Sequence, residues 1–189
     1  MLKQISDRLY RISTGWVTLA ALIVFVLFTA LVLPGQSAQE GSEADDVGSP
    51  DLSLWYAPAD LYRMAEAYGP EGRQAYIRAR FTFDVAWPLV YGAFLVTAIS
   101  WLYARAFAPG SSWRWANLAP LLGVLFDFAE NLATSLVMAR YPARTPGIDV
   151  VAPVFTLVKW VLVGGSFVLL VVGAVAAVWR WVGKQKRAP

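Results

Sequence analysis

The sequence predicts an all-α, polytopic membrane protein: a bundle of four transmembrane helices with a short amphipathic helix in the first extracytoplasmic loop. Three observations predict this class. Hydrophobic residues make up 58% of the 189 residues and charged residues only 15%, a balance typical of membrane proteins. Four apolar segments have roughly the 20 residues that a helix needs to cross ~30 Å of hydrocarbon. Aromatic residues gather near the ends of these segments, as in the aromatic belts of membrane interfaces.

The expected spans belong to a single membrane domain over residues 1–189. They cover about residues 16–33, 81–107, 115–139 and 150–182. The fourth is longer than a crossing requires, which predicts a tilted or protruding helix. The N-terminal apolar run is longer than the core of a signal peptide, so we expect it to be kept as the first helix.

The first loop, residues 34–70, has two parts. Residues 34–50 are rich in glycine, serine and acids, which predicts a mobile segment. Residues 58–68 have apolar side chains at helical spacing, and Gly69 with Pro70 follows, so we expect a short amphipathic helix there. This helix suits either a lid over the bundle or a surface helix that rests on lipid head groups.

The second span is expected to continue a helix that begins in this loop. Pro70 is a favourable residue for the start of a helix, and the helix should then run from Glu71 to Phe107. Pro88 removes one backbone hydrogen bond inside it, which predicts a kink.

Lys and Arg placement predicts that both termini are cytoplasmic, in a multi-pass protein of the cell membrane. The N-terminal segment, the loop over residues 104–114 and the C-terminal tail hold nine basic residues: Lys3, Arg8, Arg11, Arg105, Arg114, Arg180, Lys184, Lys186 and Arg187. The opposite side holds six: Arg63, Arg73, Arg78, Arg80, Arg140 and Arg144. Because the basic residues flank apolar segments, the net charge of +3 is no sign of a nucleic-acid partner.

The chain has no Cys and no His. This composition excludes thiol chemistry, Fe–S clusters and Cys-ligated zinc, and it also excludes a bis-His haem and an imidazole base. No cofactor is therefore predicted. Any chemistry must use carboxylates, amines, guanidinium groups, hydroxyls or amides.

Five strongly polar residues interrupt the expected spans: Asp84, Asp127, Glu130, Asn131 and Lys159. An acid within a membrane span is costly and is a functional-site hypothesis by default. At ~1.5 Å per residue, all five lie between the outer boundary and just past the midplane, and helical spacing gives each helix one polar face. We therefore expect one cavity with the ligand-binding residues Asp84, Tyr91, Asp127, Glu130, Asn131 and Lys159.

The charge of this group favours a ligand. Three acids face one lysine, so Lys159 can pair with one carboxylate and the others must be protonated, hydrated or neutralised. Arg78 and Arg80 lie just outside Asp84 and are able to reach inward. The alternative is structural, because polar side chains also hold transmembrane helices together without any ligand.

Four features stand out in the second part of the chain: the run Tyr68–Tyr76, Asp84, the run Phe126–Asn131 and the pair Lys159–Trp160. In these features the chain resembles a family of small bacterial four-helix membrane proteins of unknown function. The resemblance covers most of the chain after residue 55. It implies the bacterial inner membrane and no particular activity.

Asp84 followed by Pro88 is similar to the acid-then-proline pattern in the second helix of the emopamil-binding and sigma-2-receptor (EXPERA) group. The layout also resembles that group, which has four helices, cytoplasmic termini, a large first loop and acids in an intramembrane pocket. The resemblance implies a pocket for sterols or amphiphilic amines. The sterol isomerases of the group rely on a His, which this chain lacks, so isomerase activity does not follow.

Binding of a ligand is the function that these residues favour. An acidic pocket that opens outward or laterally would take a membrane lipid or a small amphiphilic, cationic molecule. Trp and Tyr side chains at its rim would stack on a cation.

Three other functions stay open. Asp127 and Glu130 are the candidate acid and base of a carboxylate-based isomerase or hydrolase, so whether the protein is an enzyme is undecided. A proton- or ion-coupled transporter would need a homodimer, because four helices are few for alternating access. A non-catalytic assembly subunit is the third. The acids and Asn131 offer all-oxygen ligands for a metal ion, but Lys159 argues against such a site and no metal site is predicted.

Overall fold

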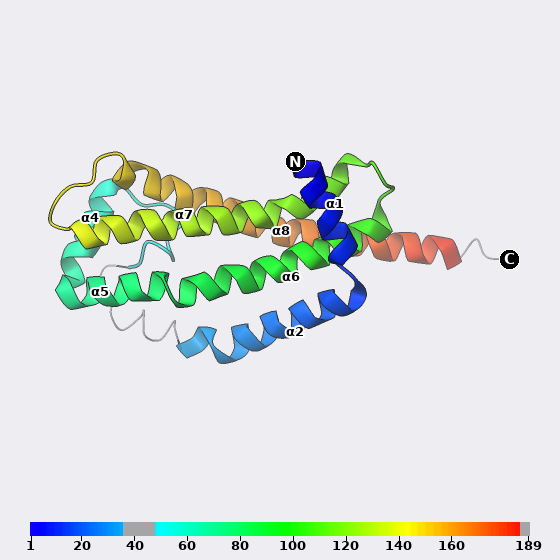
Figure 1. Cartoon of the computed structure of the whole chain (residues 1–189), viewed down its shortest axis with the longest axis horizontal. Helices are drawn as coiled ribbons and strands as arrows, with labels where there is room; N and C mark the ends of the chain where they lie inside the picture. Colours follow the sequence, from blue (N-terminus) through cyan, green and yellow to red (C-terminus); the bar gives the residue numbers. More distant parts are fainter. Residues whose placement is uncertain (36–47, 186–189) are drawn as a thin grey trace.

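The structure is a computed structural model that describes residues 1–35 and 48–185. Most of the segment predicted to be mobile, residues 34–50, falls outside this range. The described chain consists of helices and connecting turns (Figure 1). The elements are α1 (Leu2–Ile12), α2 (Gly15–Leu31), α4 (Pro58–Ala67), α5 (Gly69–Arg80), α6 (Phe83–Ala106), the 3₁₀ helix η1 (Ser112–Leu118), α7 (Ala119–Arg140) and α8 (Ile148–Gln185).

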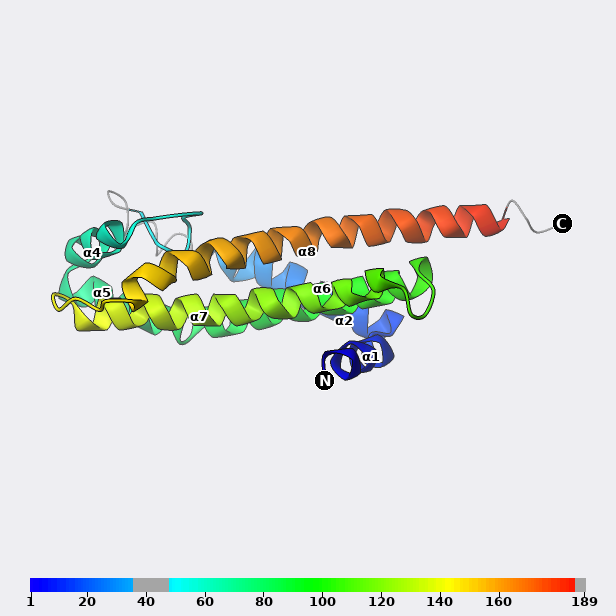
Figure 2. The same cartoon turned by 90° about the horizontal axis from the view of Figure 1, so that it is seen from above.

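The helices confirm the all-α class that the sequence predicts. Four helical segments in the described ranges are long and apolar enough to cross a membrane: Gly15–Gly35, Gly69–Ala106, Ser112–Arg140 and Ile148–Gly183. The long helices α2, α6, α7 and α8 run side by side in both views (Figures 1 and 2). α7 packs along α8, whereas α2 packs mainly against α6 and buries none of its side chains fully.

α4 and α5 cover one end of α7 and α8. α4 begins at Pro58, and the carboxylate of Asp60 accepts a hydrogen bond of 2.8 Å from the backbone N–H of Ala57, an interaction that stabilises a helix start. Leu61 and Ala65 on its inner face are fully buried in a hydrophobic core with α7 and α8. This end of the bundle, which we call the α4–α5 end, carries the charged residues described below.

The expected continuous helix from Glu71 to Phe107 is wrong, because the chain breaks at Phe81 and Thr82 between α5 and α6. The hydroxyl of Thr82 donates a hydrogen bond of 2.7 Å to the carbonyl of Arg78. Such a side-chain bond competes with the backbone hydrogen bonds that would continue the helix. The break leaves Arg80 at the end of one helix and Asp84 in the first turn of the next.

The opposite end of the bundle is crossed by α1, a short helix that the sequence reading did not anticipate (Figures 1 and 2). α1 packs against α6 and η1. Ser6 of α1 donates a 2.9 Å hydrogen bond to Asn117 Oδ1, and Asn117 Nδ2 donates to Ser6 O at 3.3 Å and to Ser100 Oγ at 3.2 Å. We call Ser6, Ser100 and Asn117 the neutral network. α8 extends beyond this end of the bundle (Figure 2).

Candidate functional site

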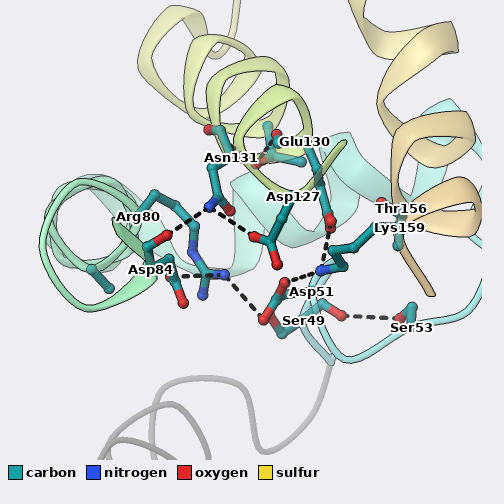
Figure 3. Close-up of polar contacts among 12 residues, drawn as sticks. Ser49, Asp51, Ser53, Arg80, Asp84, Asp127, Glu130, Asn131, Thr156 and Lys159 are labelled. Carbon is teal, nitrogen blue, oxygen red and sulfur yellow. Dashed lines mark hydrogen bonds and ion pairs between the residues drawn. The ribbon is translucent and has the colours of Figure 1, made fainter. Parts of the chain in front are cut away.

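The polar residues predicted to share a cavity come together at the α4–α5 end (Figure 3). Asp84 comes from α6, Asp127 and Glu130 from α7, and Lys159 from α8, and each of these side chains is buried. Two further residues join them, Asp51 from the loop before α4 and Arg80 from α5. We call the six ionisable residues the charged cluster: Asp51, Arg80, Asp84, Asp127, Glu130 and Lys159.

Lys159 pairs with two carboxylates. Its Nζ atom lies 2.6 Å from Glu130 Oε2 and forms an ion pair with Asp51 Oδ1. Lys159 is only 4% exposed and Glu130 only 1%, so both are removed from solvent. A buried cation needs such partners because an unpaired charge in the interior costs several kcal/mol.

Arg80 forms the second centre of positive charge and is 2% exposed. Its Nη1 atom lies 3.0 Å from Asp84 Oδ2 and 3.2 Å from Asp51 Oδ2, and its guanidinium stacks on the ring of Tyr76 at 4.6 Å from the centroid. The two oxygens of Asp51 therefore connect Arg80 with Lys159. Burial alone would raise the pKa of Asp51, but Lys159 and Arg80 outweigh it and lower the pKa to about 2.

Asp127 differs from the other acids because its partners are neutral. Tyr91 OH donates a hydrogen bond of 2.8 Å to Asp127 Oδ2, and Asn131 Nδ2 donates one of 3.2 Å to Asp127 Oδ1. The same amide group of Asn131 also donates to the backbone carbonyl of Asp84 at 3.3 Å. Among the ion pairs of the described residues, none includes Asp127.

A cavity of about 160 Å³ lies beside Asp127. One part of its wall is polar, with three of the acids, Lys159 and the Tyr91 side chain. The rest is aromatic or aliphatic and comes from α2, α6 and α8. The full lining is Phe25, Asp51, Asp84, Trp87, Tyr91, Asp127, Lys159, Trp160, Val163 and Phe167.

The predicted residues thus divide into two groups. Asp84, Tyr91, Asp127 and Lys159 line the cavity, whereas Glu130 and Asn131 lie behind it and hold Lys159 and Asp127. The cluster contains four carboxylates and two cations, which leaves a formal charge of −2. This surplus of negative charge lies beside a wall rich in aromatic rings, an arrangement that attracts cations.

Asp51 is the residue of the site that sequence reasoning missed. It belongs to an acid-rich loop, where nothing in the composition separates it from Glu43 or Asp45. The one available signal is position, because Asp51 comes directly before the apolar run Leu52–Tyr56. The sequence predicts only that Arg80 can reach inward from outside Asp84, whereas the structure buries it in the charged cluster.

The acids of the cluster do not form a metal site in this structure. In the described part of the chain, no three His, Cys, Asp or Glu side chains are arranged to hold a metal ion. Instead, Arg80 and Lys159 lie between the carboxylates and pair with three of them. The cluster is thus built around two cations that belong to the protein.

The fold and the cluster define an all-helical protein with four membrane-length apolar helices and a buried charged site at one end. Comparisons of the chain with models of protein families, with curated proteins and with solved structures find no match. The resemblances drawn from the sequence therefore stay predictions.

Proposed function

We propose that this chain is an integral membrane protein that binds the cationic head group of a lipid or other amphiphile in the cavity beside Asp127. The observation that carries the proposal is the contrast within the cluster. Asp51, Asp84 and Glu130 have cationic partners, whereas among the described residues the hydrogen-bond donors to Asp127 are the neutral side chains of Tyr91 and Asn131. An ammonium group in the cavity would supply the missing positive charge.

Membrane insertion is supported by the four apolar helices, whose outward side chains are largely hydrophobic. The Lys and Arg distribution favours cytoplasmic termini. With this orientation the α4–α5 end is extracytoplasmic, and the cavity lies toward the outer leaflet. A bacterial inner membrane fits the family resemblance stated above.

The aromatic wall favours an ammonium over a metal ion. Trp87 and Tyr91 of α6, Phe25 of α2 and Trp160 of α8 all line the cavity. Aromatic rings attract a positive group that lies over their faces, by ~2 kcal/mol or more where water is excluded. A substituted ammonium keeps its charge and also buries methyl or methylene groups against these rings.

The size of the cavity limits what it can hold. Sites that enclose a drug-sized ligand have volumes of ~300–1,000 Å³, whereas this cavity has about 160 Å³. It therefore suits a head group rather than a whole lipid. An alkyl chain would leave it between α2 and α8, where Phe167 and Trp160 of the lining are each 37% exposed.

An enzyme that uses Asp127 and Glu130 as acid and base has less support. Glu130 does not line the cavity and is held by Lys159. The two carboxylates would therefore not face the same ligand.

The test is a binding measurement on the full chain in micelles of a non-ionic detergent, because phospholipids carry charged head groups of their own. The probe is dodecyltrimethylammonium, and the signal is the change in tryptophan fluorescence, since Trp87 and Trp160 line the cavity, corrected with empty micelles. We expect saturable binding that Asp127→Asn weakens ten- to hundred-fold, because a hydrogen bond or ion pair to a charged group contributes about 1.5–3 kcal/mol.

Asp60→Asn is the matched control, because Asp60 is a partly exposed acid that pairs with Arg63 away from the cavity. It should leave the affinity unchanged. Equal affinity in wild type and Asp127→Asn would refute the proposal.

A further inference from the structure

Asp51 occupies the charged cluster as a ligand would. It is the one member that comes from a loop, and it reaches two cations from different helices, Arg80 on α5 and Lys159 on α8. Each cation also has a carboxylate partner on a helix: Asp84 for Arg80, and Glu130 for Lys159. Asp51 is thus an added anion on a framework that the helices already build.

The described loop that carries Asp51 is anchored on both sides by the buried residues Ser49, Pro50 and Tyr56, whereas the stretch directly after Asp51 is exposed. Ser53 bonds to the carbonyls of Ser49 and Pro50, and Tyr68 OH donates to the carbonyl of Gly48. The next apolar side chains point outward, with Leu52, Leu54 and Trp55 each more than half exposed. The Asp51 side chain is itself 21% exposed, so an anion from outside can reach its position.

The pair Arg80–Lys159 has the chemistry of an anion site. Arginine offers a planar fork that matches two oxygens of a carboxylate or phosphate, and lysine binds phosphate as a compact point charge. In Asp51 one oxygen faces Arg80 and the other faces Lys159. Two oxygens of a phosphate group can make the same two contacts.

We propose that Arg80 and Lys159 form an anion-binding subsite, which Asp51 fills in this structure and which takes the phosphate or carboxylate of a ligand when the Asp51 side chain moves away. Exchange of one anion for another keeps both buried cations paired. Because Asp51 and Lys159 line the same cavity as Asp127, the natural ligand is a zwitterionic head group. Its cation lies by Asp127 and the aromatic wall, and its anion lies between Arg80 and Lys159.

The assignment of a zwitterionic ligand rests on the proposed function, whereas the anion subsite does not. Three probes test the two separately. Dodecyltrimethylammonium, dodecyl phosphate and dodecylphosphocholine share one chain and differ in the head group. They are titrated into wild type and Asp51→Ala in micelles of a non-ionic detergent. We expect Asp51→Ala to bind dodecyl phosphate and dodecylphosphocholine at least ten-fold more tightly than wild type, while dodecyltrimethylammonium gains no affinity.

Glu130→Gln is the matched control for charge. It removes one negative charge beside Lys159 but leaves Asp51 in place, so it should give less than a three-fold gain for dodecyl phosphate. An equal gain in Glu130→Gln, or no gain in Asp51→Ala, overturns the subsite. If only the trimethylammonium probe fails to bind wild type, the cation site fails and the anion subsite stands.

Inorganic phosphate distinguishes a head group from a free anion and covers the case in which Asp51→Ala folds poorly. At constant ionic strength, phosphate should raise the Tm of Asp51→Ala and leave that of wild type unchanged. Absence of this rescue contradicts the subsite. If inorganic phosphate binds Asp51→Ala as tightly as dodecyl phosphate, the subsite takes free phosphate and the head-group assignment is wrong.

Discussion

The neutral network and the charged cluster lie at opposite ends of the bundle, and they are built differently. The neutral network uses Asn117 to tie α1 to α6, and both polar atoms of its amide are hydrogen-bonded. The charged cluster uses Asn131 in a similar place, but Asn131 Oδ1 has no hydrogen-bond partner among the described residues. The cluster also has a surplus of two carboxylates and a cavity beside it.

The difference teaches how to tell a structural network from a candidate site. Buried polar groups are nearly always satisfied, because an unsatisfied group costs ~1–3 kcal/mol. In the neutral network, both polar atoms of the Asn117 amide have hydrogen-bond partners, so no ligand is needed to satisfy them. The charged cluster has two more carboxylates than cations, and Asp127, which has neutral partners, lines the cavity. A cationic ligand can therefore complete the cluster.

Removal of Arg80 should give the largest change in stability. Arg80→Gln leaves Asp51 and Asp84 without a shared cation in a buried position, and breaking a buried ion pair in this way costs ~3–5 kcal/mol. Thermal unfolding in detergent should show a large fall in Tm. Arg63→Gln is the matched control, since Arg63 is exposed and such pairs contribute ~1 kcal/mol or less. Equal effects of the two substitutions would mean that the cluster contributes no more than a surface pair.

Acid should remove the contribution of Asp51. Its pKa is lowered from 3.8 to about 2, so it stabilises the fold fully above about pH 5, and this stabilisation is lost as the pH falls from about 4 to 2. The shift corresponds to about 2 kcal/mol.

The measurement is the stability of wild type minus that of Asp51→Asn, followed from pH 6 to 2. The neighbouring Arg80, Asp84, Glu130 and Lys159 are present in both proteins, so the difference isolates the contribution of Asp51. We expect the difference to shrink toward zero in acid. A difference that does not depend on pH would contradict the ion pairs of Asp51.

Asp127→Asn should change stability least, although it changes binding most. The amide can still accept a hydrogen bond from Tyr91, and no described cation loses a partner, so we expect less than about 1 kcal/mol in either direction. Asn117→Leu in the neutral network should cost ~1–3 kcal/mol, because Ser6 and Ser100 lose their partner. If Asp127→Asn destabilises more than Asn117→Leu, Asp127 serves the fold rather than a ligand.

The sequence predicts the helices and the inner members of the cluster because both depend on local pattern. Long apolar runs define α2, α6, α7 and α8. Polar residues within such runs, here Asp84, Asp127 and Lys159, almost always face the interior of the bundle. Helical spacing also explains why Asp127 and Glu130 both face the other helices.

The remainder could not be predicted because it depends on contacts between distant segments. Asp51 and Lys159 are 108 residues apart, and no local pattern selects Asp51 from the other acids of its loop. In the sequence, Arg80 resembles the basic residues that commonly flank a span. Its burial depends on the packing of α4 and α5. α1 is too short and polar for a span, and its place depends on the hydrogen bonds of Ser6 to Asn117.

The break at Phe81 and Thr82 makes the short connection between α5 and α6 a candidate hinge. α5 is held in place by its packing on α7 and by the Arg80–Asp84 ion pair, which links the helices on either side of the break. A change of dihedral angles at the two residues of the break would tilt α5 against α6. We expect a molecule that competes for Arg80 to weaken one of these two restraints and so to favour the tilt.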